Sequence, residues 1–207
     1  MSEQIPSLNE LVQLVNNLKS SKIKNIVDQR MIEFESVPRN FNSLFKELAF
    51  CILAAGTSAE LSIKTVNHLG DTLFNGSEEK IQKKLKEVYR FHTIRAGYLY
   101  NARESFKKIN INSKNIRELL IQNIKGIGMK EASHFLRNIG FKNYAIVDFH
   151  IVDILSNHGL IEKPKTLNVK RYLEIEAVLR KLADELGMSL AELDLYLWYH
   201  ETGKVLK

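Results

Sequence analysis

The chain has 207 residues, 44% of them hydrophobic, so it can bury a sizeable core as one domain or as two small lobes. Its longest apolar run, 48–55, is far too short for a spanning helix and the start MSEQIPSLNE resembles no signal peptide, so a soluble, intracellular protein is expected. The net charge of +6, from 30 Lys and Arg against 24 Asp and Glu, favours a polyanionic partner such as nucleic acid.

Apolar residues recur at helical spacing along almost the whole chain, beginning with 8–18. Helix signals agree with this pattern. The candidate N-caps are Asn42, Ser77 and Asn168, and the glycines placed to end helices are Gly70, Gly140 and Gly187. No long stretch alternates as a half-buried strand would. The sequence therefore predicts an all-α protein of about ten or eleven helices.

The single cysteine, Cys51, lies in the apolar stretch LAFCILAAG and is interpreted as a small buried hydrophobe. One thiol excludes an internal disulfide and a four-cysteine iron–sulfur cluster.

A glycine hairpin, Gly126-Ile127-Gly128, is expected between a short helix that ends at Ile124 and a second helix that starts near Met129. Without Cβ atoms at the glycines, backbone N–H groups and the second helix's N-terminus can approach a phosphate closely. A glycine C-cap that only joins two packed helices would produce the same letters. A dinucleotide loop explains them poorly, because Glu131 stands where a third glycine belongs and no strand precedes the turn.

Lys130 falls in the first turn of the second helix, where the positive end of the helix dipole disfavours the ammonium form. A nucleophilic lysine needs such help, because only the neutral amine attacks. Without a partner, a solvated lysine that contacts phosphate is the plainer interpretation.

Asp148 is the candidate partner. The helix from Lys130 to Asn138 rises roughly 12 to 14 Å, and an extended 144–147 can return about 13 Å, which brings Asp148 back level with Lys130. Asp148 would also cap the helix that starts near Phe149, which is its structural explanation. A cap fixes one carboxylate oxygen and leaves the other free, so both roles are compatible.

The last helix has the clearest start, because Ser189 and Glu192 form a capping box. Trp198, the only tryptophan, lies on this helix. Elsewhere the histidines lack a zinc-protease HExxH pattern and no GxSxG motif occurs, so neither metal catalysis nor a cofactor is expected.

The strings KGIGMKEASHFLRNIG and AIVDFHI resemble the helix-hairpin-helix DNA glycosylase superfamily, and within it the compact 8-oxoguanine DNA glycosylase/AP lyases of archaea and thermophilic bacteria. The likeness extends over nearly the whole chain, including ELAFCILAAGTSAE, RFHTIRAGYL and the ending ELDLYLWYHETGKVLK. It implies a two-lobed all-α fold with the active site in the interlobe cleft. The expected terminal lobe is 1–56 with 145–207, and the central lobe, 57–144, carries the hairpin.

The resemblance also implies a DNA repair enzyme whose target nucleotide is flipped out of the duplex. The Lys130 amine would displace the damaged base at the sugar's anomeric carbon, form a Schiff base and lead to β-elimination. Asp148 would stabilise positive charge on the sugar and help to keep the lysine neutral. The expected partner is double-stranded DNA with 8-oxoguanine or abasic sites, bound by a monomer in the cytoplasm, at the nucleoid.

Further roles follow from the same resemblance. Gly126, Ile127 and Gly128 would grip the DNA backbone, and Arg90 and Phe91 would fill the gap in the duplex. Trp198 would stack on the extruded base, although a core aromatic is the alternative. Lys207 matches the subfamily's terminal lysine, which closes over the base.

Two departures from the family pattern affect expected DNA contacts. Ala54, Ala55 and Gly56 replace a usual threonine-alanine-asparagine string, and Phe149 replaces a basic residue after the aspartate. Two alternatives remain: a monofunctional alkylbase glycosylase that uses Asp148 alone, and a non-catalytic DNA-binding module. Lys130 argues against both, because neither needs the amine.

Overall fold

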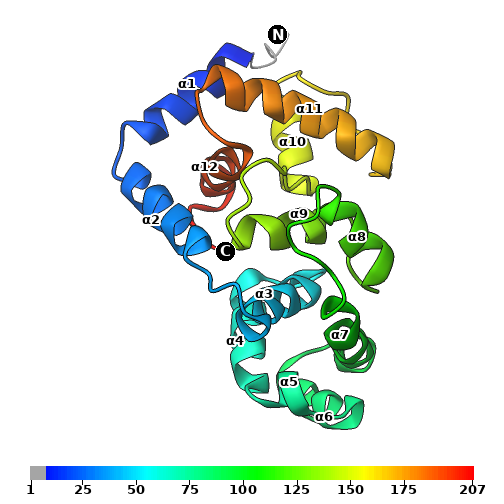
Figure 1. Ribbon diagram of the computed structural model, residues 1–207. Helices are drawn as coiled ribbons and strands as arrows, with labels where there is room; N and C mark the ends of the chain where they lie inside the picture. Colours follow the sequence, from blue (N-terminus) through cyan, green and yellow to red (C-terminus); the bar gives the residue numbers. More distant parts are fainter. Residues whose placement is uncertain (1–7) are drawn as a thin grey trace. The chain divides into compact units, whose positions relative to one another are not determined.

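The computed structural model describes residues 8–207, and within this range the chain forms twelve helices and no strand (Figure 1). The expected all-α class is confirmed. Residues 1–7 of the expected terminal lobe lie outside the described residues. None of the described helices is both long and apolar enough to cross a membrane. The chain divides into two compact units, one formed by residues up to Ser36 with Gly140–Lys207, the other by Val37–Ile139.

The first unit is built around its last helix. Its described helices are α1 (Leu8–Lys19), α2 (Ile23–Glu35), α10 (Phe149–Asn157), α11 (Val169–Glu185) and α12 (Leu190–Thr202). Helix α12 packs against all four others, and its buried residues cover more than one face. The capping box at its start is confirmed: Ser189 Oγ accepts from the Glu192 N–H at 3.2 Å, and Glu192 Oε2 accepts from the Ser189 N–H at 2.9 Å.

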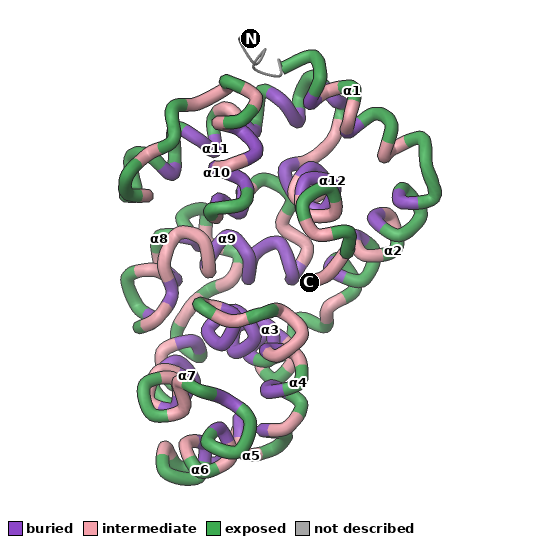
Figure 2. Tube along the Cα trace, turned by 180° about the vertical axis from the view of Figure 1, so that it is seen from behind, coloured by how far each residue is buried: buried purple, intermediate pink, exposed green. Residues whose placement is uncertain are grey.

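The second unit is built around α3. Its helices are α3 (Phe41–Ala54), α4 (Ala59–Leu69), α5 (Thr72–Asn75), α6 (Glu78–Val88), α7 (His92–Phe106), α8 (Ile116–Asn123) and α9 (Met129–Asn138). Helix α3 is buried along most of its length and packs against α4, α7 and α9 (Figure 2). The compact units divide after Ser36 and Ile139, whereas the expected lobes divide after 56 and 144, and α3 packs with the central helices.

Buried polar side chains join α3 to α9 inside this unit. The Asn138 amide donates to Glu47 Oε2 at 3.3 Å, and the Arg137 guanidinium donates to Asn138 Oδ1 at 3.1 and 3.2 Å. All three side chains are buried. Because buried polar groups are costly unless they are hydrogen-bonded, this network selects one alignment of α9 on α3.

Most of the predicted caps are present. Ser77 and Asn168 accept from backbone N–H groups at the starts of α6 and α11, and Gly70 ends α4. The assignment of Asn42 is wrong, since α3 begins at Phe41 and Asn40 Oδ1 accepts from the Ser43 N–H at 2.9 Å. Both asparagines precede the same apolar run, so the sequence did not distinguish them.

Candidate functional site

The hairpin between α8 and α9 lies where the sequence predicts it. Helix α8 ends with Ile124 as its C-cap, and α9 begins at Met129 with Gly128 as its N-cap. The Ile127 N–H donates to the Ile124 carbonyl at 3.3 Å, and the Gly128 N–H donates to Glu131 Oε2 at 3.2 Å. Two hairpin N–H groups are therefore already bonded within the protein, while the Gly126 N–H donates no hydrogen bond among the described residues.

The two glycines of the hairpin are needed to different degrees. Gly126 has φ +90°, and a Cβ there would lie 2.3 Å from Tyr98 Cδ2, so the tyrosine ring occupies the space of a side chain. A Cβ at Gly128 would meet only the flexible end of Glu131, at 3.1 Å. The requirement for glycine is thus strict at Gly126 alone, and it arises from Tyr98 on α7, which the sequence did not reveal.

Lys130 is half-buried in the first turn of α9. One turn later His134 is buried, with its ring at 89° to the Phe50 ring and 5.3 Å from it between centroids. Burial raises the pKa of the Cys51 thiol far above its ordinary value and nearby Glu47 raises it further, whereas the Lys130 charge acts in the opposite direction. Lys130 therefore lies within electrostatic range of the buried thiol on α3, and Cys51 is the buried hydrophobe that the sequence predicts.

Asp148 is the N-cap of α10, as expected. Its Oδ1 accepts from the Ile151 N–H at 3.1 Å, and α10 begins at Phe149. The other carboxylate oxygen forms no hydrogen bond within the part of the chain that the structure describes. The cap therefore holds the carboxylate while leaving one oxygen available, which is the arrangement that a catalytic carboxylate needs.

The segment that leads to Asp148 is held by buried side chains of α11. The Tyr172 hydroxyl donates to the Ala145 carbonyl at 2.7 Å and accepts from the Val147 N–H at 3.1 Å. Glu176 Oε2 accepts from the Ala145 N–H at 3.0 Å. Residues 144–148 have no regular secondary structure, so these bonds replace those of a helix or strand. Sequence reasoning missed both side chains, because they lie far along the chain on an ordinary amphipathic helix.

Lys130 belongs to the second unit and Asp148 to the first. Their expected approach to one another stays a prediction.

Trp198 lies on α12 and is half-buried, outside the buried core of the first unit. The His150 ring lies at 89° to it with a centroid separation of 5.3 Å, and His150 Nδ1 is 3.4 Å from Glu201 Oε1. Phe149, between the capping aspartate and His150, is 76% exposed. Lys207 is half-buried. Stacking by Trp198 and closure by Lys207 stay predictions.

Arg90 and Phe91 lie together at the start of α7 in the second unit. The Arg90 Cζ atom is 4.2 Å from the centroid of the Phe91 ring, and Phe91 is the N-cap of α7. A Cβ at Gly56 would be 3.9 Å from Phe91, and Arg95 donates to the Ala55 carbonyl at 2.7 Å. Of the residues that depart from the family pattern, Gly56 therefore lies beside Phe91, and Ala55 is bonded to Arg95 on α7. The role of Arg90 and Phe91 in DNA binding stays a prediction.

Among residues 8–207, no three or more His, Cys, Asp or Glu side chains are grouped so that they could hold a metal ion.

The family model and the similar known proteins indicate the same family. Residues 27–188 match the family model described as 8-oxoguanine DNA glycosylase (Ogg-HhH). The chain is 47% identical to an 8-oxoguanine DNA glycosylase/AP lyase of Korarchaeum cryptofilum, with 97% of this chain and 99% of that protein covered. It is 46% identical to the protein of the same name from Methanocaldococcus jannaschii, with 95% and 99% covered.

Solved structures agree. The crystal structure of the M. jannaschii 8-oxoguanine glycosylase/lyase in complex with a 15mer DNA containing 8-oxoguanine matches with a TM-score of 0.91 at 45% identity, covering 95% of this chain and 99% of that one. The 8-oxoguanine DNA glycosylase of Thermotoga maritima matches with a TM-score of 0.90 at 39% identity, covering 97% and 100%. The chain belongs to the 8-oxoguanine DNA glycosylase family.

Proposed function

We propose that this protein is a bifunctional DNA repair enzyme that excises 8-oxoguanine from double-stranded DNA and cleaves the strand at the resulting abasic site. The observation that carries the proposal is the match along nearly the whole chain to relatives named for both activities, one of them in complex with DNA that contains 8-oxoguanine. It acts as a monomer on intracellular DNA, in the cytoplasm at the nucleoid.

Lys130 supplies the nucleophile. The lone pair of its neutral Nζ forms a bond to the anomeric carbon of the deoxyribose, and the bond to the base breaks, with its electrons leaving on the base. The sugar ring opens to a Schiff base, a C2′ proton is lost, and the 3′ phosphate departs by β-elimination. The place of Lys130 supports this role, because it is half-buried in the first turn of α9, directly after the hairpin proposed to hold the DNA backbone.

Asp148 supplies the carboxylate for the same reaction. Positive charge develops on the sugar as the base departs, and a fixed carboxylate stabilises it without having to reorganise. Two sets of hydrogen bonds support this assignment: the Ile151 N–H donates to Asp148 Oδ1, and the Tyr172 hydroxyl bonds the backbone of the preceding segment. Together they hold the Asp148 carboxylate and leave one of its oxygens free.

The remaining predicted residues bind substrate. The Gly126-Ile127-Gly128 hairpin holds the DNA backbone, with the Gly126 N–H as its free donor, and Arg90 and Phe91 fill the space left by the flipped nucleotide. Trp198 offers an aromatic surface to the extruded base, and Lys207 lies over the same base. Partial burial of Trp198 supports this role, because a stacking surface has to reach solvent before the base arrives.

The experiment compares duplexes that carry 8-oxoguanine, an abasic site, uracil or an alkylated purine. Strand cleavage is measured with and without alkali, which separates base excision from lyase activity. The proposal predicts fast cleavage of the 8-oxoguanine and abasic duplexes without alkali, and much slower reaction of the other two. Excision that needs alkali to cut the strand would support a monofunctional glycosylase, and binding without excision would support a non-catalytic module.

A further inference from the structure

An aromatic ring with two cations lies beside the hairpin in the second unit. Tyr98 on α7 packs against Gly126, as the 2.3 Å separation between its Cδ2 and a Cβ built at Gly126 demonstrates. The Arg95 Cζ atom is 5.5 Å from the Tyr98 ring centroid, and Lys125 Nζ is 5.8 Å from it. We call Arg95, Tyr98 and Lys125 the Tyr98 cluster.

The positive charge of this cluster is not neutralised within the described chain. Neither Arg95 nor Lys125 forms an ion pair with a carboxylate there, and the Tyr98 hydroxyl and Lys125 Nζ form no hydrogen bond. Arg95 donates to the Ala55 carbonyl at 2.7 Å, while its Nε is buried without a partner. Lys107, the C-cap of the helix that carries Tyr98, by contrast pairs with Glu104 at 2.7 Å. The cluster therefore presents two unpaired cations and a free hydroxyl donor.

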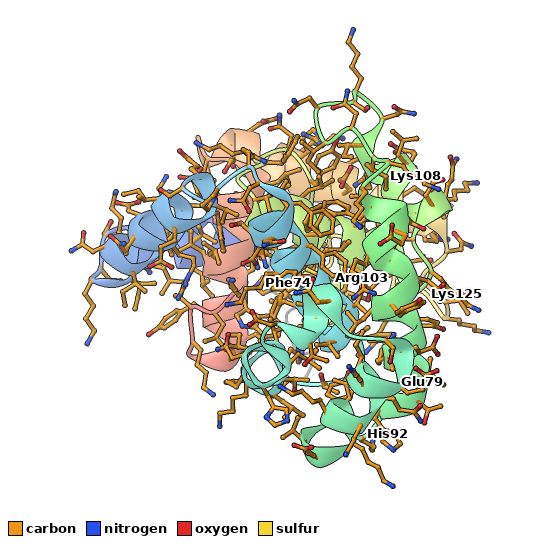
Figure 3. All side chains as sticks on the ribbon, turned by 60° about the horizontal axis from the view of Figure 1, so that its bottom comes forward. Phe74, Glu79, His92, Arg103, Lys108 and Lys125 are labelled. Carbon is orange, nitrogen blue, oxygen red and sulfur yellow. The ribbon has the colours of Figure 1, made fainter. Side chains whose placement is uncertain are left out.

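Lys125 directly precedes Gly126, whose N–H also lacks an acceptor among residues 8–207. Figure 3 shows Lys125 at the outer side of α7, and its side chain is exposed. Lys125 and Gly126 both lie against the Tyr98 ring, and an ammonium group, a phenolic hydroxyl and a backbone N–H are all donors that a phosphodiester oxygen accepts from. The Tyr98 ring is fixed by its packing against Gly126, which restricts where its hydroxyl can go.

We propose that Lys125 and the Tyr98 hydroxyl form a second phosphate subsite beside the hairpin, which takes a backbone phosphodiester of bound DNA. Arg95, whose Cζ atom is 5.5 Å from the centroid of the Tyr98 ring, adds a second positive charge beside the ring. The inference rests on the proposed function, because DNA is the anion it requires. The subsite contacts no base, so it contributes equally to damaged and undamaged duplexes.

The test uses Lys125→Gln and Tyr98→Phe in the Lys130→Gln background, so that bound DNA stays uncut. Lys181→Gln, an exposed lysine on α11, is the matched control for loss of one charge. Tyr98→Phe keeps the ring that packs on Gly126 and removes only the hydroxyl. Equilibrium binding to 8-oxoguanine and undamaged duplexes is measured over a series of salt concentrations, with thermal unfolding as the check on folding.

Lys125→Gln should weaken binding to both duplexes by roughly three- to tenfold at low salt and make the plot of log affinity against log salt shallower by about one unit. Tyr98→Phe should weaken binding by about two- to tenfold with an unchanged slope, because the hydroxyl carries no charge. The subsite is overturned if Lys125→Gln behaves as Lys181→Gln does, or if its effect is confined to the 8-oxoguanine duplex.

Failure of the proposed function has a different signature. A protein with the intact Tyr98 cluster that neither binds nor cleaves any duplex would overturn the proposed function and the subsite together. Normal binding and cleavage with no effect of Lys125→Gln or Tyr98→Phe would overturn the subsite alone.

Discussion

The imidazole of His150 lies edge-on to the indole of Trp198, with ring centroids 5.3 Å apart and planes at 89°. Glu201 Oε1, on the same helix as the tryptophan, is 3.4 Å from His150 Nδ1. The pair joins the start of α10, where Asp148 is the cap, to the proposed stacking surface on α12.

His150→Ala should loosen Trp198, because the indole loses the ring that packs against it. Since Trp198 is the only tryptophan, fluorescence excited at a wavelength that the seven tyrosines do not absorb reports on this residue alone. The variant should show a shifted emission maximum and stronger quenching by acrylamide. His158→Ala, at the end of the same helix, is the control and should leave the spectrum unchanged. An unaltered spectrum in His150→Ala would show that the ring contact does not fix the indole.

Trp198→Ala should slow excision of 8-oxoguanine by roughly tenfold or more, because stacking of a base on an aromatic side chain contributes about 1 to 3 kcal/mol. Single-turnover rates on the 8-oxoguanine duplex measure this effect, with thermal unfolding recorded in parallel. Cleavage of a duplex that already contains an abasic site should change less, since no base remains to stack. Reduced stability with normal activity per folded molecule would instead make Trp198 a packing residue.

Tyr172→Phe should destabilise the protein and slow catalysis together. The variant keeps the ring but removes the hydroxyl that serves both the Ala145 carbonyl and the Val147 N–H. Each buried backbone group left without a partner costs about 1 to 3 kcal/mol, so the thermal midpoint should fall clearly. The single-turnover rate should fall as well at temperatures where the variant is fully folded, because the segment entering Asp148 is no longer held. A normal rate in the folded variant would mean that the cap alone positions Asp148.

Gly126→Ala should disrupt the hairpin, whereas Gly128→Ala should be tolerated. Alanine at position 126 meets Tyr98 at 2.3 Å and must adopt φ +90°, while at position 128 only the end of Glu131 has to move. Strained left-handed backbone costs about 1 to 3 kcal/mol, so we expect lower stability and weaker DNA binding for Gly126→Ala alone. Adding Tyr98→Ala should recover part of the loss by removing the steric clash. Equal behaviour of the two single variants would contradict this account of the hairpin.

The sequence predicted the helices, hairpin and cap of the site better than it predicted the side chains that hold them in place. The positions of the hairpin, the start of α9 and the Asp148 cap follow from local signals: two glycines, a polar cap and helical periodicity. Three contacts join residues that are far apart in the chain, and no local pattern encodes them. They are the contacts of Tyr98 with Gly126, of Tyr172 with 145–147, and of His150 with Trp198. The same reason explains why the expected lobes and the compact units place α3 differently. Its sequence indicates burial, but not which helices bury it.

The most direct test of the central claim, that Lys130 is the nucleophile, is borohydride trapping on a duplex with 8-oxoguanine. Wild-type protein should form a covalent adduct, and Lys130→Gln should form none while still shifting the same duplex in a gel with nearly unchanged stability. Asp148→Asn should also trap poorly with little change in stability, because the asparagine Oδ1 can still accept from the Ile151 N–H and cap α10. A Lys130→Gln protein that traps as the wild type does would contradict the account, because another amine would then form the Schiff base.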